Sequence, residues 1–173
     1  MKKFLSLILA VLTLGSVLVG CEDTNGSTAQ NENEDTIISI PGTLVAENFS
    51  FTIVSAQLSN SVTLDSGVDI TIDADEGKQF LIICIDATNT SNDVRNLGPF
   101  TTYVDDTTVL PKNMLGKYKD RVLMTGAVHP GKTMQTYAMY QVPMDWEFFE
   151  ISYIDTLTCK VSGTVKFSRS DVK

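Results

Sequence analysis

Two groups of acidic side chains are the first residues of this chain whose type and spacing could support chemistry. Asp73, Asp75 and Glu76 form one group, and Asp105 and Asp106 form the other. Carboxylate oxygens are the ligands that calcium prefers, and paired carboxylates can serve a hydrolase as acid and base. The first group does not follow the EF-hand spacing, because its twelfth position is a cysteine rather than a glutamate. Asp73, Asp75 and Glu76 are therefore weak calcium candidates. Solvated turns explain both groups more simply, and no metal site is predicted.

Residues 126–133 match the phosphate-binding loop pattern G-x-x-x-x-G-K-[ST] letter by letter. That loop binds phosphate when a helix follows it, because the amides at the helix N-terminus cradle the anion. Residues 134–142 instead alternate in polarity and end at Pro143, which predicts a strand. The same segment holds His129, the single histidine, and the sequence assigns it no serine or cysteine partner. We therefore expect a hairpin turn, no cofactor and no enzyme site.

The first residues of the chain predict its location. Lys2 and Lys3 precede an uncharged apolar run over residues 4–19, and Gly20 and Cys21 follow. The run is shorter than the ~20 residues that a spanning helix needs, and its order is that of a bacterial export signal. Residues 18–21 resemble the lipobox of bacterial lipoproteins, whose cysteine receives a diacylglycerol. The resemblance implies acyl chains such as palmitate on Cys21 and a lipid-anchored location on the extracytoplasmic face of the cell membrane. An ordinary secretory signal is the alternative.

Composition indicates how the chain is organised. A formal net charge of -8 argues against nucleic acid as a partner, because such a surface repels phosphate backbones. Residues 22–36 contain almost no apolar side chain, so they cannot bury enough surface to offset the entropy of ordering. We expect a signal peptide over residues 1–20, the lipidated cysteine and a flexible acidic linker over residues 21–44, and one folded domain over residues 45–173.

Beyond the linker, alternation with a period of two predicts an all-β fold. Residues 80–89 form the clearest strand, with the row Leu81, Ile83 and Ile85 facing the core. A change of parity at residues 53–54 predicts a β-bulge, and residues 105–106 predict a hairpin turn. Further strands are expected near residues 49–58, 68–73, 100–104, 107–110, 122–124, 134–142, 149–153 and 163–167, with a loop over residues 113–120. Short strands separated by turns favour an antiparallel sandwich over a closed barrel.

Cys84 and Cys159 are the cysteines that remain if Cys21 carries lipid. An oxidising compartment would permit a disulfide between them. Strand parity, however, places Cys84 on the outward row of its strand and Cys159 on an inward, apolar row. Parity therefore argues against the disulfide, although the compartment leaves it open.

Tyr137, Met139, Trp146 and Phe148 fall on the row or turn opposite the inferred core. If they share one face, they form a candidate binding patch, because aromatic residues and methionine are enriched in interface cores. The alternative is that Trp146 and Phe148 fold over a sheet edge as a satellite of the core.

Four segments of the chain occur in an order that resembles a known family. They are residues 77–83, 88–91, 130–132 and 140–143, which read Gly-Lys-Gln-Phe-Leu-Ile-Ile, Thr-Asn-Thr-Ser, Pro-Gly-Lys and Tyr-Gln-Val-Pro. The chain here resembles the immunoglobulin-like domain of unknown function found in Gram-positive surface lipoproteins, which is related to secreted immunoprotective antigens. The resemblance implies an immunoglobulin-like β-sandwich at the cell surface and transfers no catalytic residue. The polar loop 113–120 and Cys84 depart from the family pattern.

These observations predict a membrane-anchored extracytoplasmic lipoprotein whose immunoglobulin-like domain binds and does not catalyse. The expected partners are the membrane, through the N-terminal lipid, and a cell-envelope protein or a small ligand. One alternative is an extracytoplasmic hydrolase or a calcium-dependent ligand-binding protein that uses the acidic loops at Asp73, Asp75 or Asp105. Another is a structural envelope component, in which the chain itself would cover the face at Tyr137, Met139 and Trp146.

Overall fold

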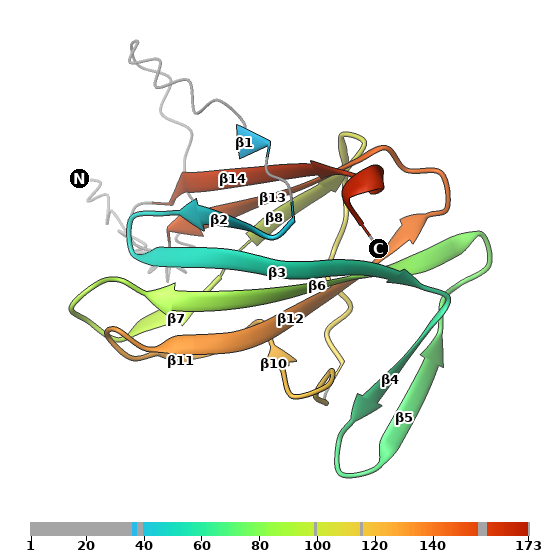
Figure 1. Ribbon diagram of the computed structural model, residues 1–173, viewed down its shortest axis with the longest axis horizontal. Helices are drawn as coiled ribbons and strands as arrows, with labels where there is room; N and C mark the ends of the chain where they lie inside the picture. Colours follow the sequence, from blue (N-terminus) through green and yellow to red (C-terminus); the bar gives the residue numbers. More distant parts are fainter. Residues whose placement is uncertain (1–35, 38–39, 99, 115, 156–158, 173) are drawn as a thin grey trace, which may run out of the picture. The chain divides into compact units, whose positions relative to one another are not determined.

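The computed structural model describes residues 36–37, 40–98, 100–114, 116–155 and 159–172. Its elements are β1 (Thr36–Ile37), β2 (Gly42–Val45), β3 (Phe49–Ser59), β4 (Ser61–Asp65), β5 (Asp69–Asp73), β6 (Lys78–Asn89), β7 (Arg95–Leu97), β8 (Phe100–Val104), β9 (Thr107–Thr108), β10 (Val122–Leu123), β11 (Gly126–Val128), β12 (Thr133–Pro143), β13 (Phe148–Asp155), β14 (Lys160–Ser168) and the 3₁₀ turn η1 (Arg169–Asp171). One five-stranded sheet has the order β1-β14-β13-β8-β9, and the other has the order β10-β12-β6-β3-β2 (Figure 1). Two small pairs, β4-β5 and β7-β11, complete the fold.

The main core lies between the two five-stranded sheets. β6 is the central strand of its sheet and pairs antiparallel with both β3 and β12. Its residues Leu81, Ile83 and Ile85 share the main core with Phe149 and Phe167 of the opposite sheet, whose ring centroids lie 5.3 Å apart. Burying each such side chain stabilises the fold by about 1.5–3 kcal/mol. The all-β sandwich and the inward row expected from alternation are confirmed.

A second, outer cluster of buried side chains lies on the opposite face of β6 and β12. Phe80, Ile82 and Cys84 of β6 pack there, and the β4-β5 hairpin contributes Val62 and Leu64. The cluster also holds Tyr118, Tyr137 and Met139. Figure 1 shows β4 and β5 as an arm that leaves the ends of β3 and β6. Because this arm and the segment around Tyr118 cover the outer face, β6 is buried on both sides.

Both cysteines differ from the environments expected from parity. Cys84 does lie on the row opposite Leu81, but it is buried, because the β4-β5 hairpin covers that row. Cys159 is exposed, because it occupies the turn between β13 and β14 with φ of 53° instead of an inward strand position. Both thiols are free.

Several local features follow the sequence prediction. The register of β3 against β6 shifts between Ile53 and Ser55, which confirms the bulge. Asp105 and Asp106 have φ of 45° and 64° in the β8-β9 turn, a conformation that Asp tolerates better than most residues. β2, whose first three residues lie in the expected linker, pairs antiparallel with β3. Among the described residues, no helix has the length and hydropathy needed to cross a bilayer.

Candidate functional site

The four side chains of the expected binding patch do not share an exposed face. Tyr137 and Met139 are fully buried in the outer cluster, where the Tyr118 ring lies 5.9 Å from the Tyr137 ring and the Lys112 amide donates to the Met139 carbonyl. Trp146 is buried in the main core, and its ring packs edge-on against Phe167 with centroids 6.4 Å apart. Phe148 alone is exposed, at 42%. The four side chains therefore form no common exposed patch: Tyr137 and Met139 meet an outer layer of the same chain, and Trp146 packs inside the sandwich.

The weak calcium candidates lie on an open turn. Asp73 ends β5, and Asp75 and Glu76 follow it; all three side chains are exposed. The carbonyl oxygen of Asp75 accepts a hydrogen bond from the Lys78 amide at 3.0 Å, which closes the turn into β6. Within the described part of the chain, no group of three or more His, Cys, Asp or Glu side chains could hold a metal ion. These carboxylates are solvated turn residues.

Asp105, one of the acidic residues considered for a hydrolase, connects the β8-β9 turn to the segment before β13. Its carboxylate accepts hydrogen bonds from the backbone amides of Glu147 and Phe148, the latter at 2.8 Å. These bonds fix the β8-β9 turn against the segment that enters β13. A groove of about 370 Å³ beside this contact is lined by charged side chains, among them Asp105, Asp106, Asp145, Glu147, Glu150 and Lys166. The carboxylate of Asp105 thus has a structural role.

The segment that matches the phosphate-binding pattern forms a turn between two strands. β11 precedes it and β12 follows it, so a strand stands where a phosphate-binding loop needs a helix N-terminus. The Lys132 amide donates to the carbonyl of exposed His129 at 3.0 Å, and the Gly131 amide donates to the carbonyl of Asn89 at 2.9 Å. The predicted turn is confirmed, but it does not close a hairpin, because β11 pairs with β7 whereas β12 pairs with β6 and β10.

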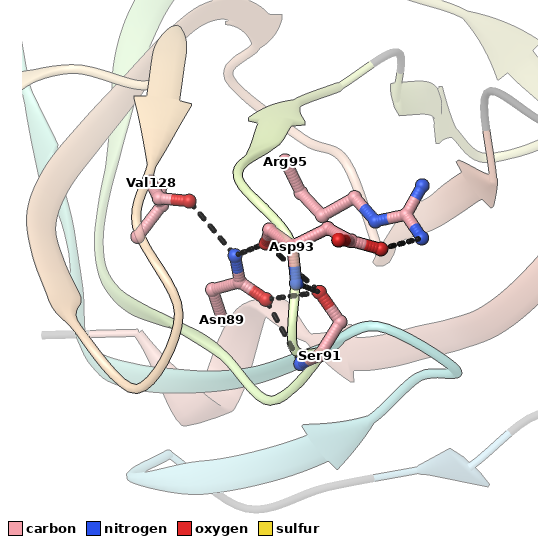
Figure 2. A network of polar contacts seen from close by, with 5 residues as sticks. All are labelled: Asn89, Ser91, Asp93, Arg95 and Val128. Carbon is pink, nitrogen blue, oxygen red and sulfur yellow. Dashed lines mark hydrogen bonds and ion pairs between the residues drawn. The ribbon is translucent and has the colours of Figure 1, made fainter.

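Asn89, the last residue of β6, also bonds to neighbouring segments through its side chain. Its amide nitrogen donates to the carbonyls of Asp93 at 2.7 Å and Val128 at 2.8 Å (Figure 2). Its amide oxygen accepts from the amide and the hydroxyl of Ser91. Arg95 pairs with the carboxylate of Asp93 at 3.5 Å. The Thr-Asn-Thr-Ser and Pro-Gly-Lys segments therefore meet in one hydrogen-bonded corner of the fold.

An uncharged pocket at the edge of β12 is the candidate binding site. It has a volume of about 370 Å³, within the range of about 300–1,000 Å³ that is typical of ligand pockets. Four segments line it: Leu97, Gly98 and Phe100; Pro111 and Asn113; Leu123, Met124 and Thr125; and Tyr137, Ala138 and Tyr140. None of these side chains carries a charge.

The floor of the pocket comes from both faces of β12. Tyr137 belongs to the outer cluster, and Tyr140 belongs to the main core. A space lined by both residues must therefore lie at the strand edge, which β10 covers only opposite Thr136 and Tyr137. The Met124 amide donates to the Tyr137 carbonyl at 2.9 Å and holds the adjoining wall in place.

The two phenols of the floor add no charge. The Tyr137 hydroxyl donates to the carbonyl of Gly116 at 3.1 Å, and burial raises the pKa of Tyr137. Burial also raises the pKa of Tyr140, and a side-chain hydrogen bond with Thr102 opposes this shift in part. Both groups therefore stay neutral over the physiological range.

Comparisons with known proteins place the chain among β-sandwich proteins. No family model matches it, and no curated protein matches it. Several solved structures share its fold. The yjhA protein of Bacillus subtilis has a TM-score of 0.57 and 21% identity over 75% of this chain and 98% of that one. An uncharacterised β-sandwich protein of Clostridium difficile has a TM-score of 0.53 and 14% identity over 83% of this chain and 99% of that one.

The third similar structure is ycdA of Bacillus subtilis, described as a candidate lipoprotein. It has a TM-score of 0.52 and 17% identity, and the match covers 71% of this chain but only 36% of that one. This chain thus corresponds to about a third of ycdA. The structural similarity establishes the shared β-sandwich fold. Because the identities are this low, ligand and activity must be argued from the chain itself.

Sequence reasoning missed the pocket because its lining is assembled from four separate segments. One local feature was present: Val122, Leu123 and Met124 are consecutive apolar residues between the polar residues 119–121 and Thr125.

Proposed function

We propose that this chain is a lipoprotein, anchored to the extracytoplasmic face of the membrane through Cys21, whose immunoglobulin-like sandwich is a non-catalytic ligand-binding module. The order of charged, apolar and small residues before Cys21 supports the anchor. Cys21 lies outside the described residues, so this part of the proposal depends on sequence. Two acyl chains contribute about 0.8 kcal/mol per buried methylene, which is enough for lasting attachment.

The observation that carries the binding function is the uncharged pocket at the edge of β12. Its floor is built from buried residues of β12, and the Met124-Tyr137 backbone bond holds one wall. A pocket that is formed before binding costs little ordering entropy when a ligand enters. The acidic side chains, in contrast, are hydrogen-bonded in turns or exposed to solvent. They therefore support hydrolysis less well than the pocket supports binding.

The anchor is tested by feeding radiolabelled palmitate to Gram-positive cells that express the chain. We expect label on the wild-type chain and on a Cys159→Ser variant, and none on Cys21→Ser, because that variant lacks the acceptor sulfur. The wild-type chain should fractionate with membranes. Unlabelled wild-type chain, or label that persists on Cys21→Ser, contradicts the lipid anchor.

The binding function is tested separately on the purified chain. We expect a low-molecular-weight extract of the cell envelope to raise its unfolding temperature, because a ligand that binds only the folded state stabilises it. A Thr125→Trp variant, which places a large ring at the pocket rim, should respond less than a Thr63→Trp variant on the exposed face of β4. An equal response of both variants contradicts binding at this pocket.

A further inference from the structure

The pocket at the edge of β12 also indicates a class of ligand, an inference that rests on the proposed binding function. We propose that it takes a neutral amphipathic small molecule, with the apolar end against Phe100, Leu123 and Met124 and a hydrogen-bonding end at Asn113 and Thr125. Its charge, its walls and its rim each support this assignment.

The first argument is the absence of charge in the lining. Charged residues make up 20% of the chain, and none lies among the residues that line this pocket. The groove at Asp105 has a similar volume and is lined by both signs of charge, so the sandwich does build charged hollows elsewhere. A charged ligand in the uncharged pocket would lose its hydration without gaining a counter-charge. The lining therefore favours a neutral molecule.

The second argument is that the apolar walls are fixed and incompletely covered. The Phe100 ring lies 5.5 Å from the Phe51 ring and 5.5 Å from the Tyr153 ring, so neighbours hold it in place. Phe100, Leu123 and Met124 are nevertheless only half-buried, which leaves apolar surface facing the pocket. A ring or short alkyl group there would remove that apolar surface from water, which favours binding.

The third argument is the position of the polar side chains. Asn113 and Thr125 are exposed, whereas Leu97, Tyr137 and Ala138 are buried, so polarity rises from the floor to the mouth. An amide and a hydroxyl both donate and accept hydrogen bonds without carrying charge. The bound molecule would keep its polar end at the mouth, where water still reaches it.

Two fluorescent probes that differ by one charge test the assignment. N-phenyl-1-naphthylamine is neutral, and 8-anilino-1-naphthalenesulfonate carries the same rings with an added sulfonate. The chain from Glu22 onward is used, because it retains every described strand and carries no acyl chain to bind the probes. We expect saturable one-to-one binding of the neutral probe and weaker binding of the sulfonate by about tenfold or more, since burying the sulfonate forfeits its hydration.

Substitutions in β10 and in the two residues after it test where the neutral probe binds. Met124→Glu should weaken binding of the neutral probe by about tenfold or more, because it puts a carboxylate in the apolar wall. Val122→Glu is the matched control: Val122 is exposed, lies two residues away and is not part of the lining, so binding should stay unchanged. If Met124→Glu unfolds early in a thermal scan, Thr125→Glu at the exposed rim replaces it.

The outcomes separate ligand class from binding function. If the sulfonate probe binds tightly and Met124→Glu abolishes that binding, the assignment to neutral ligands is wrong, but the pocket is still a binding site. Failure of both probes to bind, or binding that Met124→Glu and Thr125→Glu leave unchanged, would overturn the pocket itself. Palmitate labelling of Cys21 is independent of either result.

Discussion

The side-chain amide of Asn89 donates a hydrogen bond to the backbone carbonyl of Val128 at 2.8 Å. This bond joins the end of β6 to β11, and the same nitrogen also reaches the Asp93 carbonyl. Asn89 and Val128 are both buried, so water cannot replace the bond between them. A single amide thus holds one corner of the sandwich, where three chain segments meet.

Replacing this amide should destabilise the domain. In Asn89→Ala the carbonyls of Asp93 and Val128 lose their donor, and we expect the free energy of unfolding to fall by about 2–4 kcal/mol. Urea unfolding followed by circular dichroism measures the change. Asn96→Ala is the control, because Asn96 is an exposed residue of β7 and should cost less than about 0.5 kcal/mol. Equal effects of the two substitutions would contradict the role given to Asn89.

The β4-β5 hairpin should contribute directly to stability. Leu64 is fully buried in the outer cluster, and Leu64→Ala should cost about 3 kcal/mol through lost burial and the cavity left behind. Val68→Ala, on a side chain 70% exposed in the turn of the same hairpin, should cost close to nothing. Chemical denaturation compares them. A near-zero effect of Leu64→Ala would mean that the hairpin does not cover the outer face.

The two described cysteines should react at very different rates. Cys159 is exposed, and Cys84 is buried beneath the β4-β5 hairpin. A maleimide added to the native chain should label Cys159 in the first phase, and it should label Cys84 only as the outer cluster opens. Mass spectrometry of timed samples resolves the two peptides. Cys159→Ser removes the fast phase, and prompt labelling of Cys84 in that variant would count against the burial.

Alkaline pH should weaken the fold through Tyr140. Its pKa is raised in the folded state, so below pH ~10 the tyrosine is protonated in both states and its contribution does not change. Above pH ~10 the unfolded chain releases this proton first, and stability falls by up to about 1.4 kcal/mol per pH unit.

Comparing unfolding free energies near pH 8 and pH 11 isolates this effect. Tyr140→Phe should lose less stability over that interval than the wild-type chain does, because its ring has no proton to release. Tyr103→Phe, in the half-buried wall of the acidic groove, serves as the control for removing a phenol. An identical decline in Tyr140→Phe and the wild-type chain would show that the hydroxyl titrates normally.

Alternation in the sequence predicted the strands well where only one face of a strand is covered by other parts of the chain. The bulge after Ile53, the turn at Asp105 and the inward row of β6 all follow from period and parity alone. The expected exposure of Tyr137 failed because parity says only that a side chain lies on the other face, not what covers that face. The outer cluster that covers it is a set of tertiary contacts, and the strand β4 within that cluster gave no separate signal.

The candidate site was harder to foresee for a related reason. Its floor comes from β12, but Phe100 and Met124 arrive from segments far apart in the chain. The sequence contains no pattern that brings them together, since the geometry is set by how β8 and β10 lie along the sandwich. Conspicuous residues such as Asp73 and His129 are solvent-exposed in the structure, Asp73 at the end of β5 and His129 in a turn.

β6 is buried on both faces from Gln79 to Ile85 and is hydrogen-bonded along both edges. No local fluctuation can bring its amides to water without separating the β4-β5 arm, the opposite sheet or a neighbouring strand. Its backbone protons should therefore exchange with deuterium only through unfolding of the whole domain. The slowest protons of this strand would report the global stability of the protein, residue by residue, under native conditions.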